Sequence, residues 1–251
     1  MDAGPVGFRE ARRDGVTAPA PSRKDTVTYP SPEPHAVPTA QDYDVISRQL
    51  GRPARDVVEI PARCVCGNPL VAATAPRLAN GTPFPTTFYL THPVVTSAVS
   101  RLEAAGAMTE MNERLAGDPG LAAAYRAAHE AYLAARRRIG ELAGTGPVPE
   151  IEGVSAGGMP ERVKCLHVLV GQALAMGPGV NPLGDEALEG IAEWWTRDRC
   201  YCAGAWDADS AAPSKDLSRH GPQGLPSLTG RPAPVRRRDT ERNQDVEGDG
   251  A

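Results

Sequence analysis

Five cysteines fall into three short clusters, and these clusters are the residues best suited to chemistry in this chain. The clusters are Cys64-Val65-Cys66, Cys165-Leu166-His167 and Cys200-Tyr201-Cys202. The N-terminus has no basic segment followed by an apolar run, so the sequence predicts no signal peptide and a reducing, cytoplasmic location. Clustered cysteines in a reducing compartment indicate a metal or redox site more often than a disulfide framework, and their odd number indicates the same.

Zinc is the metal that these residue types favour, because thiolate and imidazole are its preferred ligands and a closed tetrahedral site needs four of them. The spacing differs from that of a zinc ribbon, since one residue instead of two separates the members of each Cys-x-Cys pair. We therefore expect a site that takes its ligands from several segments. The candidate metal ligands are Cys64, His92, Cys165, Cys200 and Cys202, with Cys66 and His167 as additional candidates.

The clusters differ in whether their two side chains are expected to point the same way. In an extended segment Cys64 and Cys66 point to the same face. In a helix Cys165 and His167 lie about 200° apart around the axis, so they are not expected to bind one metal together unless the helix starts late. One of these two residues is therefore expected to have another role.

Three functions and one plain alternative stay open. The first function is a metal-binding protein whose Cys/His site is structural or regulatory. The second is a zinc-dependent hydrolase, in which three ligands leave one position for water and His167 or Glu161 acts as acid or base. The third is an iron–sulfur or thiol redox sensor that uses the five cysteines. The plain alternative is that the thiols are ordinary buried cysteines, since this residue type is often buried.

The elements that must position these residues are mostly helical. The predicted strands cover residues 57–60, 70–74 and 86–90, and the predicted helices cover 42–50, 93–105, 107–116, 121–142, 160–176 and 185–195. His92 falls where the third strand passes into a helix, because Pro93 suits a first helical turn. The pattern predicts an α+β fold: a helix-rich single domain with a small antiparallel sheet.

Composition divides the chain into three parts. Residues 1–40 and 206–251 are rich in Pro, Ser and Gly and lack apolar periodicity, so they are predicted to be disordered arms. Residues 41–205 form the predicted globular domain, which is long enough to fold around a core without an obligatory metal. The net charge of −4 provides no general attraction for nucleic acid or anionic lipid, and no apolar run approaches the roughly 20 residues of a membrane span.

Several short motifs follow one another through the middle of the chain. They are Arg63-Cys64 with Gly67 and Pro69, Gly81-Thr82-Pro83-Phe84-Pro85-Thr86 running into Tyr89-Leu90-Thr91-His92-Pro93, Val99-Ser100-Arg101-Leu102-Glu103, Lys164-Cys165-Leu166-His167, and Asn181-Pro182-Leu183-Gly184. In this order the motifs resemble the bacterial domain-of-unknown-function family 501. The resemblance spans essentially the whole predicted domain and is specific as a set, although each motif alone is weak. The Ala-, Arg- and Pro-rich composition is typical of an actinobacterial member.

The resemblance implies no reaction, because the family has no established activity. Some relatives carry cysteine at the position of His92, which implies a metal ligand there, since both side chains bind zinc. The histidine in turn makes an all-cysteine iron–sulfur site less straightforward. In actinobacterial relatives the gene tends to lie near those for enolase, a septum-formation initiator and an exopolyphosphatase-like enzyme. This association implies a protein partner in cell division or phosphate physiology.

Overall fold

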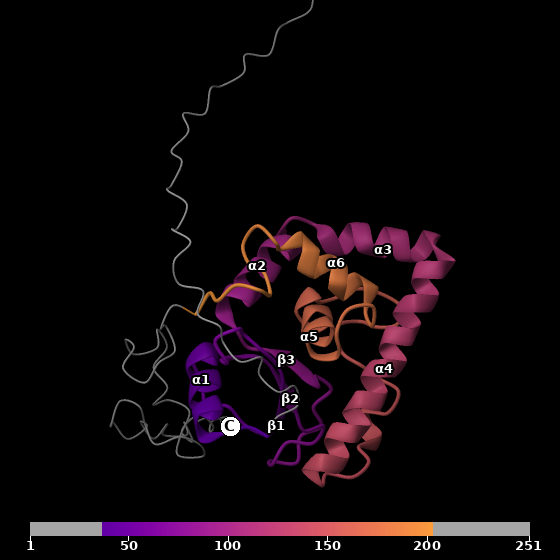
Figure 1. Cartoon of the computed structure of the whole chain (residues 1–251). Helices are drawn as coiled ribbons and strands as arrows, with labels where there is room; N and C mark the ends of the chain where they lie inside the picture. The colour runs from indigo at the N-terminus through magenta and orange to yellow at the C-terminus, as the bar shows by residue number, and fades with distance from the viewer. Residues whose placement is uncertain (1–36, 203–251) are drawn as a thin grey trace, which may run out of the picture.

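A three-stranded antiparallel sheet lies beside six α-helices in the part of the chain that the structure describes (Figure 1). The computed structural model describes residues 37–202. In chain order the elements are α1 (Ala40–Leu50), β1 (Val57–Arg63), β2 (Pro69–Thr74), β3 (Phe88–Leu90), α2 (Pro93–Ala104), α3 (Ala107–Gly117), α4 (Pro119–Ala143), the 3-10 helix η1 (Pro149–Ile151), α5 (Leu166–Met176) and α6 (Pro182–Gly190). The predicted α+β class is confirmed. The predicted arms lie outside the described residues, apart from 37–40.

The sheet is covered on both of its faces. Its strand order is β1-β2-β3, and both strand pairs are antiparallel. On the central strand Ala72 packs into a small core under α1 together with Ile46, whereas Val71 and Ala73 belong to the larger core on the other side. Because successive side chains of a strand point to opposite faces, this alternation places the sheet between α1 and the remaining helices.

Helix α5 lies at the centre of the domain, between the sheet and α6 (Figure 1). Leu166, Leu169 and Val170 on this helix are fully buried. Gly171 allows a close approach to β3, because a Cβ atom there would lie 2.8 Å from the Phe88 carbonyl oxygen. A helix whose residues are almost all apolar, as in α5, has to be largely enclosed in this way. Between residues 37 and 202 no helix, α5 included, is both long and apolar enough to cross a membrane.

The helix predicted over residues 160–176 starts later than expected, at Leu166. A glycine turn occupies the preceding residues: Gly158 has φ +94°, and a Cβ atom on it would lie 2.5 Å from the Arg162 carbonyl oxygen. Cys165 is still extended, with φ −156°, and forms the N-cap. The predicted start was wrong because backbone packing within the turn keeps these residues out of the helix.

Local capping signals determine the other helix ends. Gly51 ends α1 in the left-handed conformation, and Pro93 opens α2 as predicted. Helix α6 begins earlier than predicted, at Pro182, because the Asn181 side chain accepts a backbone N–H of the first turn at 3.0 Å. The same helix ends at Gly190, several residues before its predicted end.

Candidate metal centre

Two Cys-x-Cys pairs from distant parts of the chain meet in space. Cys64 and Cys66 lie in the turn between β1 and β2, and Cys200 and Cys202 lie in the segment after α6. The four Sγ atoms all lie within 4.8 Å of one another, and those of Cys66 and Cys202 are 3.5 Å apart. Cys64 and Cys202 are buried, with 1% and 2% of their surface exposed. The four thiols form a group that could hold a metal ion.

A tight turn between β1 and β2 brings the first pair together. The Cys64 N–H donates to the Asn68 carbonyl oxygen at 2.8 Å, and the Gly67 N–H donates to the Cys64 carbonyl oxygen at 2.8 Å. Gly67 has φ +93°, a conformation that residues with side chains rarely adopt. The glycine therefore allows the turn that carries Cys64 and Cys66.

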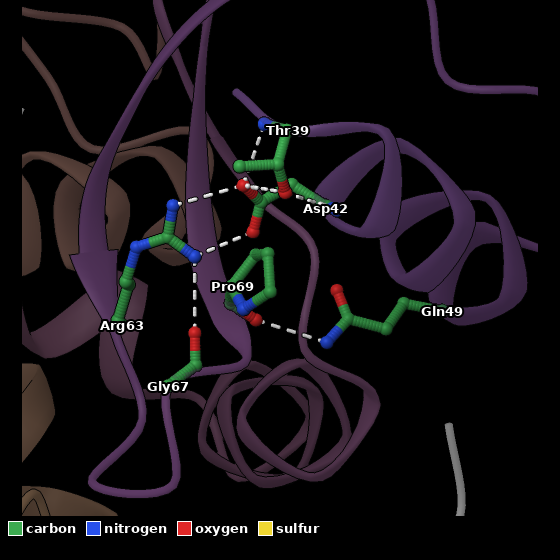
Figure 2. A network of polar contacts seen from close by, with 6 residues as sticks. All are labelled: Thr39, Asp42, Gln49, Arg63, Gly67 and Pro69. Carbon is green, nitrogen blue, oxygen red and sulfur yellow. Dashed lines mark hydrogen bonds and ion pairs between the residues drawn. The ribbon is translucent and has the colours of Figure 1, made fainter. Parts of the chain in front are cut away.

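A polar network joins this turn to the start of α1 (Figure 2). The Arg63 guanidinium donates to the Asp42 carboxylate at 3.0 Å and to the Gly67 carbonyl oxygen at 3.0 Å. The same carboxylate accepts the Thr39 N–H at 2.8 Å, and the Thr39 hydroxyl caps the helix in return. The position of the cysteine turn is therefore coupled to the N-terminus of α1.

The Asp42–Arg63 ion pair is largely shielded from water, with side-chain exposures of 7% and 11%. Burial alone would raise the pKa of Asp42, but the Arg63 and Thr39 donors outweigh burial and lower it. Gln49 of the same helix donates to the Pro69 carbonyl oxygen at 2.9 Å (Figure 2). Helix α1 thus contacts the chain on both sides of the cysteine turn.

The second pair is carried by a segment whose start is fixed in the core. Ile191 and Trp195 are buried, with 0% and 3% of their surface exposed. The Cys202 N–H points to the Cys200 sulfur at 3.4 Å. From this anchored start the segment reaches the β1–β2 turn, where the second pair meets the first.

His92 borders the cysteine group at the predicted junction between β3 and α2. Its Nε2 atom lies 3.3 Å from the Cys202 sulfur, and the side chain is fully buried. Burial lowers the pKa of His92, although the nearby Cys64 opposes this shift. A neutral imidazole with its Nε2 proton directed at the sulfur would donate a hydrogen bond to Cys202 Sγ.

Close contacts and burial shift the pKa values of the thiols in opposite directions. A hydrogen bond with Cys202 lowers the pKa of Cys64, and the same contact raises that of Cys202. Burial raises the pKa of Cys66. In the metal-free protein one thiol therefore ionises first, and its neighbours keep their protons because adjacent negative charges repel.

A second group of donors lies where α2 meets the N-terminus of α5. It consists of Glu103, Cys165 and His167, whose donor atoms all lie within 4.8 Å of one another. His167 Nδ1 lies 3.8 Å from Cys165 Sγ and 3.2 Å from Glu103 Oε1. The Cys165 contact, aided by Glu103, raises the pKa of His167 to about 9 against the effect of burial. Burial alone would raise the pKa of Cys165, but hydrogen bonds with His167 and the Val168 backbone lower it.

The structure distributes the predicted ligands over these two groups. The first holds Cys64, Cys66, Cys200 and Cys202, with His92 beside it, and the second holds Cys165 and His167. Cys165 and His167 meet because α5 starts late, which is the condition under which the sequence allowed them to act together. Glu161, the other predicted acid or base, is exposed and belongs to neither group.

Glu103 is the candidate that sequence reasoning missed. It shares one face of α2 with Thr96 and Ser100, because these positions are separated by four and three residues. A polar face on the helix that follows His92 is the signal that could have pointed to it. Its partners on α5 come from tertiary packing, which the helical spacing does not show.

Comparison with known proteins places the chain in a family. Residues 60–189 match the family described as Protein of unknown function (DUF501), and this match covers more than half of the chain. The protein therefore belongs to that family. The matched segment includes the first Cys-x-Cys pair and the whole second group, and it ends before Cys200. Neither a curated protein nor a solved structure matches the chain.

Proposed function

We propose that the protein binds one zinc ion through Cys64, Cys66, Cys200 and Cys202, and that the ion is structural. The convergence of the four sulfur atoms within 4.8 Å carries this proposal. Zinc–sulfur bonds of about 2.3 Å place the sulfurs of a tetrahedral site about 3.8 Å apart. The 3.5 Å separation between the Cys66 and Cys202 sulfurs is close to that value.

The form of the site supports a structural role over hydrolysis at this position. Four thiolates complete a tetrahedral shell and leave no position for a reacting water, whereas catalytic zinc sites keep one position open. Cys64 and Cys202 are also buried, so a substrate has no direct path to the ion from their side. This zinc ion would join the β1–β2 turn to the segment after α6.

The spacing of the sulfurs favours a single ion over an iron–sulfur cluster. Several irons and bridging sulfides occupy the space between the thiolates of a cluster and hold some of them further apart than one ion does. A zinc protein is colourless and an iron–sulfur protein is brown, so the absorption spectrum of protein purified without air separates the two readily.

Cobalt substitution tests the proposed ligands. The full chain, without a histidine tag, is loaded with Co²⁺, whose bonds to thiolates absorb strongly in the near ultraviolet in proportion to their number. We expect Cys64→Ser and Cys202→Ser to lose most of this absorption and to unfold at a lower temperature, because metal binding and folding are linked.

Cys165→Ser is the matched control, since it removes a thiol outside the four-cysteine group. It should keep most of the thiolate–cobalt absorption. If Cys64→Ser and Cys202→Ser both keep the metal content and absorption of the unsubstituted protein, the proposed site is wrong.

A further inference from the structure

The second group has the geometry of a set of metal ligands. His167 Nδ1 lies 3.2 Å from Glu103 Oε1 and 3.8 Å from Cys165 Sγ. With bonds of about 2.0 to 2.1 Å to nitrogen or oxygen and about 2.3 Å to sulfur, a tetrahedral zinc ion needs its ligand atoms roughly 3.3 to 3.6 Å apart. Both distances lie within a few tenths of an ångström of this range.

The orientation of the His167 imidazole leaves Nδ1 as the nitrogen that can bind a metal. His167 Nε2 lies 3.1 Å from the Thr96 carbonyl oxygen, which can only accept a hydrogen bond, so Nε2 carries a proton. Nδ1 is then the atom that faces Cys165 and Glu103. Metal-binding histidines are usually fixed in this manner, with the other ring N–H donated to a carbonyl or carboxylate.

The arrangement differs from that of a thiol nucleophile with a histidine base. In such a triad the orienting carboxylate sits on the imidazole nitrogen opposite the one that faces the nucleophile. In this group Glu103 and Cys165 face the same nitrogen of His167. Three donors thus converge on one point, where a cation would neutralise the carboxylate and the thiolate together.

Each donor is positioned by a separate contact. Glu103 Oε1 accepts the Leu166 N–H at 2.7 Å, so the first turn of α5 fixes the carboxylate of α2. Cys165 is the N-cap of α5, and His167 follows in the first turn. The late start of α5 therefore builds this group, and the side chains of Glu103 and His167 remain 22% and 24% exposed.

We propose that Glu103, Cys165 and His167 form a second zinc site, with a fourth coordination position open to solvent. Three protein ligands with one free position are typical of catalytic zinc, which binds and activates a water molecule. The ligand class for the free position is a small donor such as water, imidazole or a thiol. This inference is independent of the four-cysteine site, because the two groups share no residue.

Metal stoichiometry of the full chain tests the second site. Reduced protein without a tag is titrated with Co²⁺, and the bound metal is measured after gel filtration. We expect two ions per chain in the unsubstituted protein and one in Cys165→Ser, His167→Asn or Glu103→Gln. Glu161→Gln is the matched control, because Glu161 is an exposed carboxylate near this segment that lies outside the group, and it should bind two ions.

Added imidazole provides a readout of the open position. We expect it to shift the visible absorption of the cobalt-loaded protein and of Cys202→Ser, and to leave that of Cys165→Ser unchanged. The proposal is overturned if the unsubstituted protein and all three variants bind the same number of ions, because the second group then contributes no bound ion. A single bound ion together with rapid alkylation of Cys165 by iodoacetamide would instead identify a reactive thiolate beside an imidazolium. Circular dichroism verifies the fold of each variant. If Cys165→Ser or His167→Asn fails to fold, the ion count of Glu103→Gln decides.

Discussion

Cys66 and Cys202 are 136 positions apart in the sequence, yet their sulfur atoms lie 3.5 Å apart. Among the elements of residues 37–202, all strands but β1 and all helices but α1 lie between them in the chain. A metal ion bound to both residues would tie the segment after α6 to the β1–β2 turn in the folded protein. We therefore expect removal of the ion to loosen the segment after α6 more than the core helices.

Removal of the metal should loosen the segment that carries the second pair. With a zinc chelator present, amide hydrogen exchange in residues 191–202 and 64–68 is expected to rise at least about tenfold, because local opening no longer breaks metal bonds. The amides of α4 serve as an internal control and should keep their protection. In Cys64→Ser the two segments should exchange fast with or without the chelator. Unchanged exchange in the unsubstituted protein after complete metal removal would contradict the proposed structural role.

The Asp42–Arg63 pair should stabilise the domain in a pH-dependent way. Asp42→Asn is expected to lower the free energy of unfolding by about 3 kcal/mol at pH 7, because it leaves a shielded guanidinium without its counter-ion. Since the folded-state pKa of Asp42 is lowered, this contribution is present above the unfolded value of 3.8 and is lost as the pH falls through the folded value. Urea unfolding at several pH values should show the difference between the two proteins shrink below about pH 4.

Asp44→Asn is the control for this measurement, because Asp44 lies on the same helix and pairs with Arg48 four residues later. An ion pair of this kind contributes only about 0.5 kcal/mol. Equal losses in the two variants would show that the network around the cysteine turn has no special role.

His92 should tune the four-cysteine site without being one of its ligands. His92→Phe is expected to weaken zinc binding by about 10- to 100-fold, because it removes the proposed hydrogen bond to the Cys202 sulfur, while the number of bound ions stays the same. Competition with a chromophoric chelator measures the affinity. His129→Phe is the control, since that histidine is also buried but contacts Ser155 and should leave zinc affinity unchanged. Complete loss of one ion in His92→Phe would instead make His92 a direct ligand.

The contact between α5 and α6 should be sensitive to a single methyl group. A Cβ atom at Gly184 would lie 2.5 Å from the Leu169 carbonyl oxygen, so Gly184→Ala forces the two helices apart. We expect a loss of roughly 1–3 kcal/mol in the free energy of unfolding. Gly117→Ala meets nothing within 4 Å at the end of α3 and should be neutral or stabilising by up to about 1 kcal/mol. Similar effects of both substitutions on denaturant midpoints would argue against this packing.

The accuracy of the sequence predictions depended on how local each signal was. Gly51 and Pro93 set helix ends by their own backbone preferences, so the C-terminal end of α1 and the start of α2 were predictable. The start of α5 depends on backbone packing around Gly158, which no local pattern reports. The family predicted from its motifs is confirmed, while the proposed metal and its role stay predictions.

In the candidate site, too, local signals were predictable and tertiary contacts were not. The types and clustering of the cysteines were sufficient to predict that thiols would gather, and the structure brings four of them together. The separation of Cys165 from the other cysteines was not predictable, because it follows from how α5 packs against α2. The sequence could not show that Glu103 and His167 would meet across that contact.

Zinc-edge X-ray absorption identifies the atoms that surround the proposed zinc ion. The measurement uses the full chain with Cys165→Ser. This substitution disrupts the second group and leaves the four-cysteine group intact. We expect one zinc ion per chain, surrounded by four sulfur atoms at about 2.3 Å. Protein that binds no metal, or zinc whose neighbours are mainly nitrogen and oxygen, would contradict it.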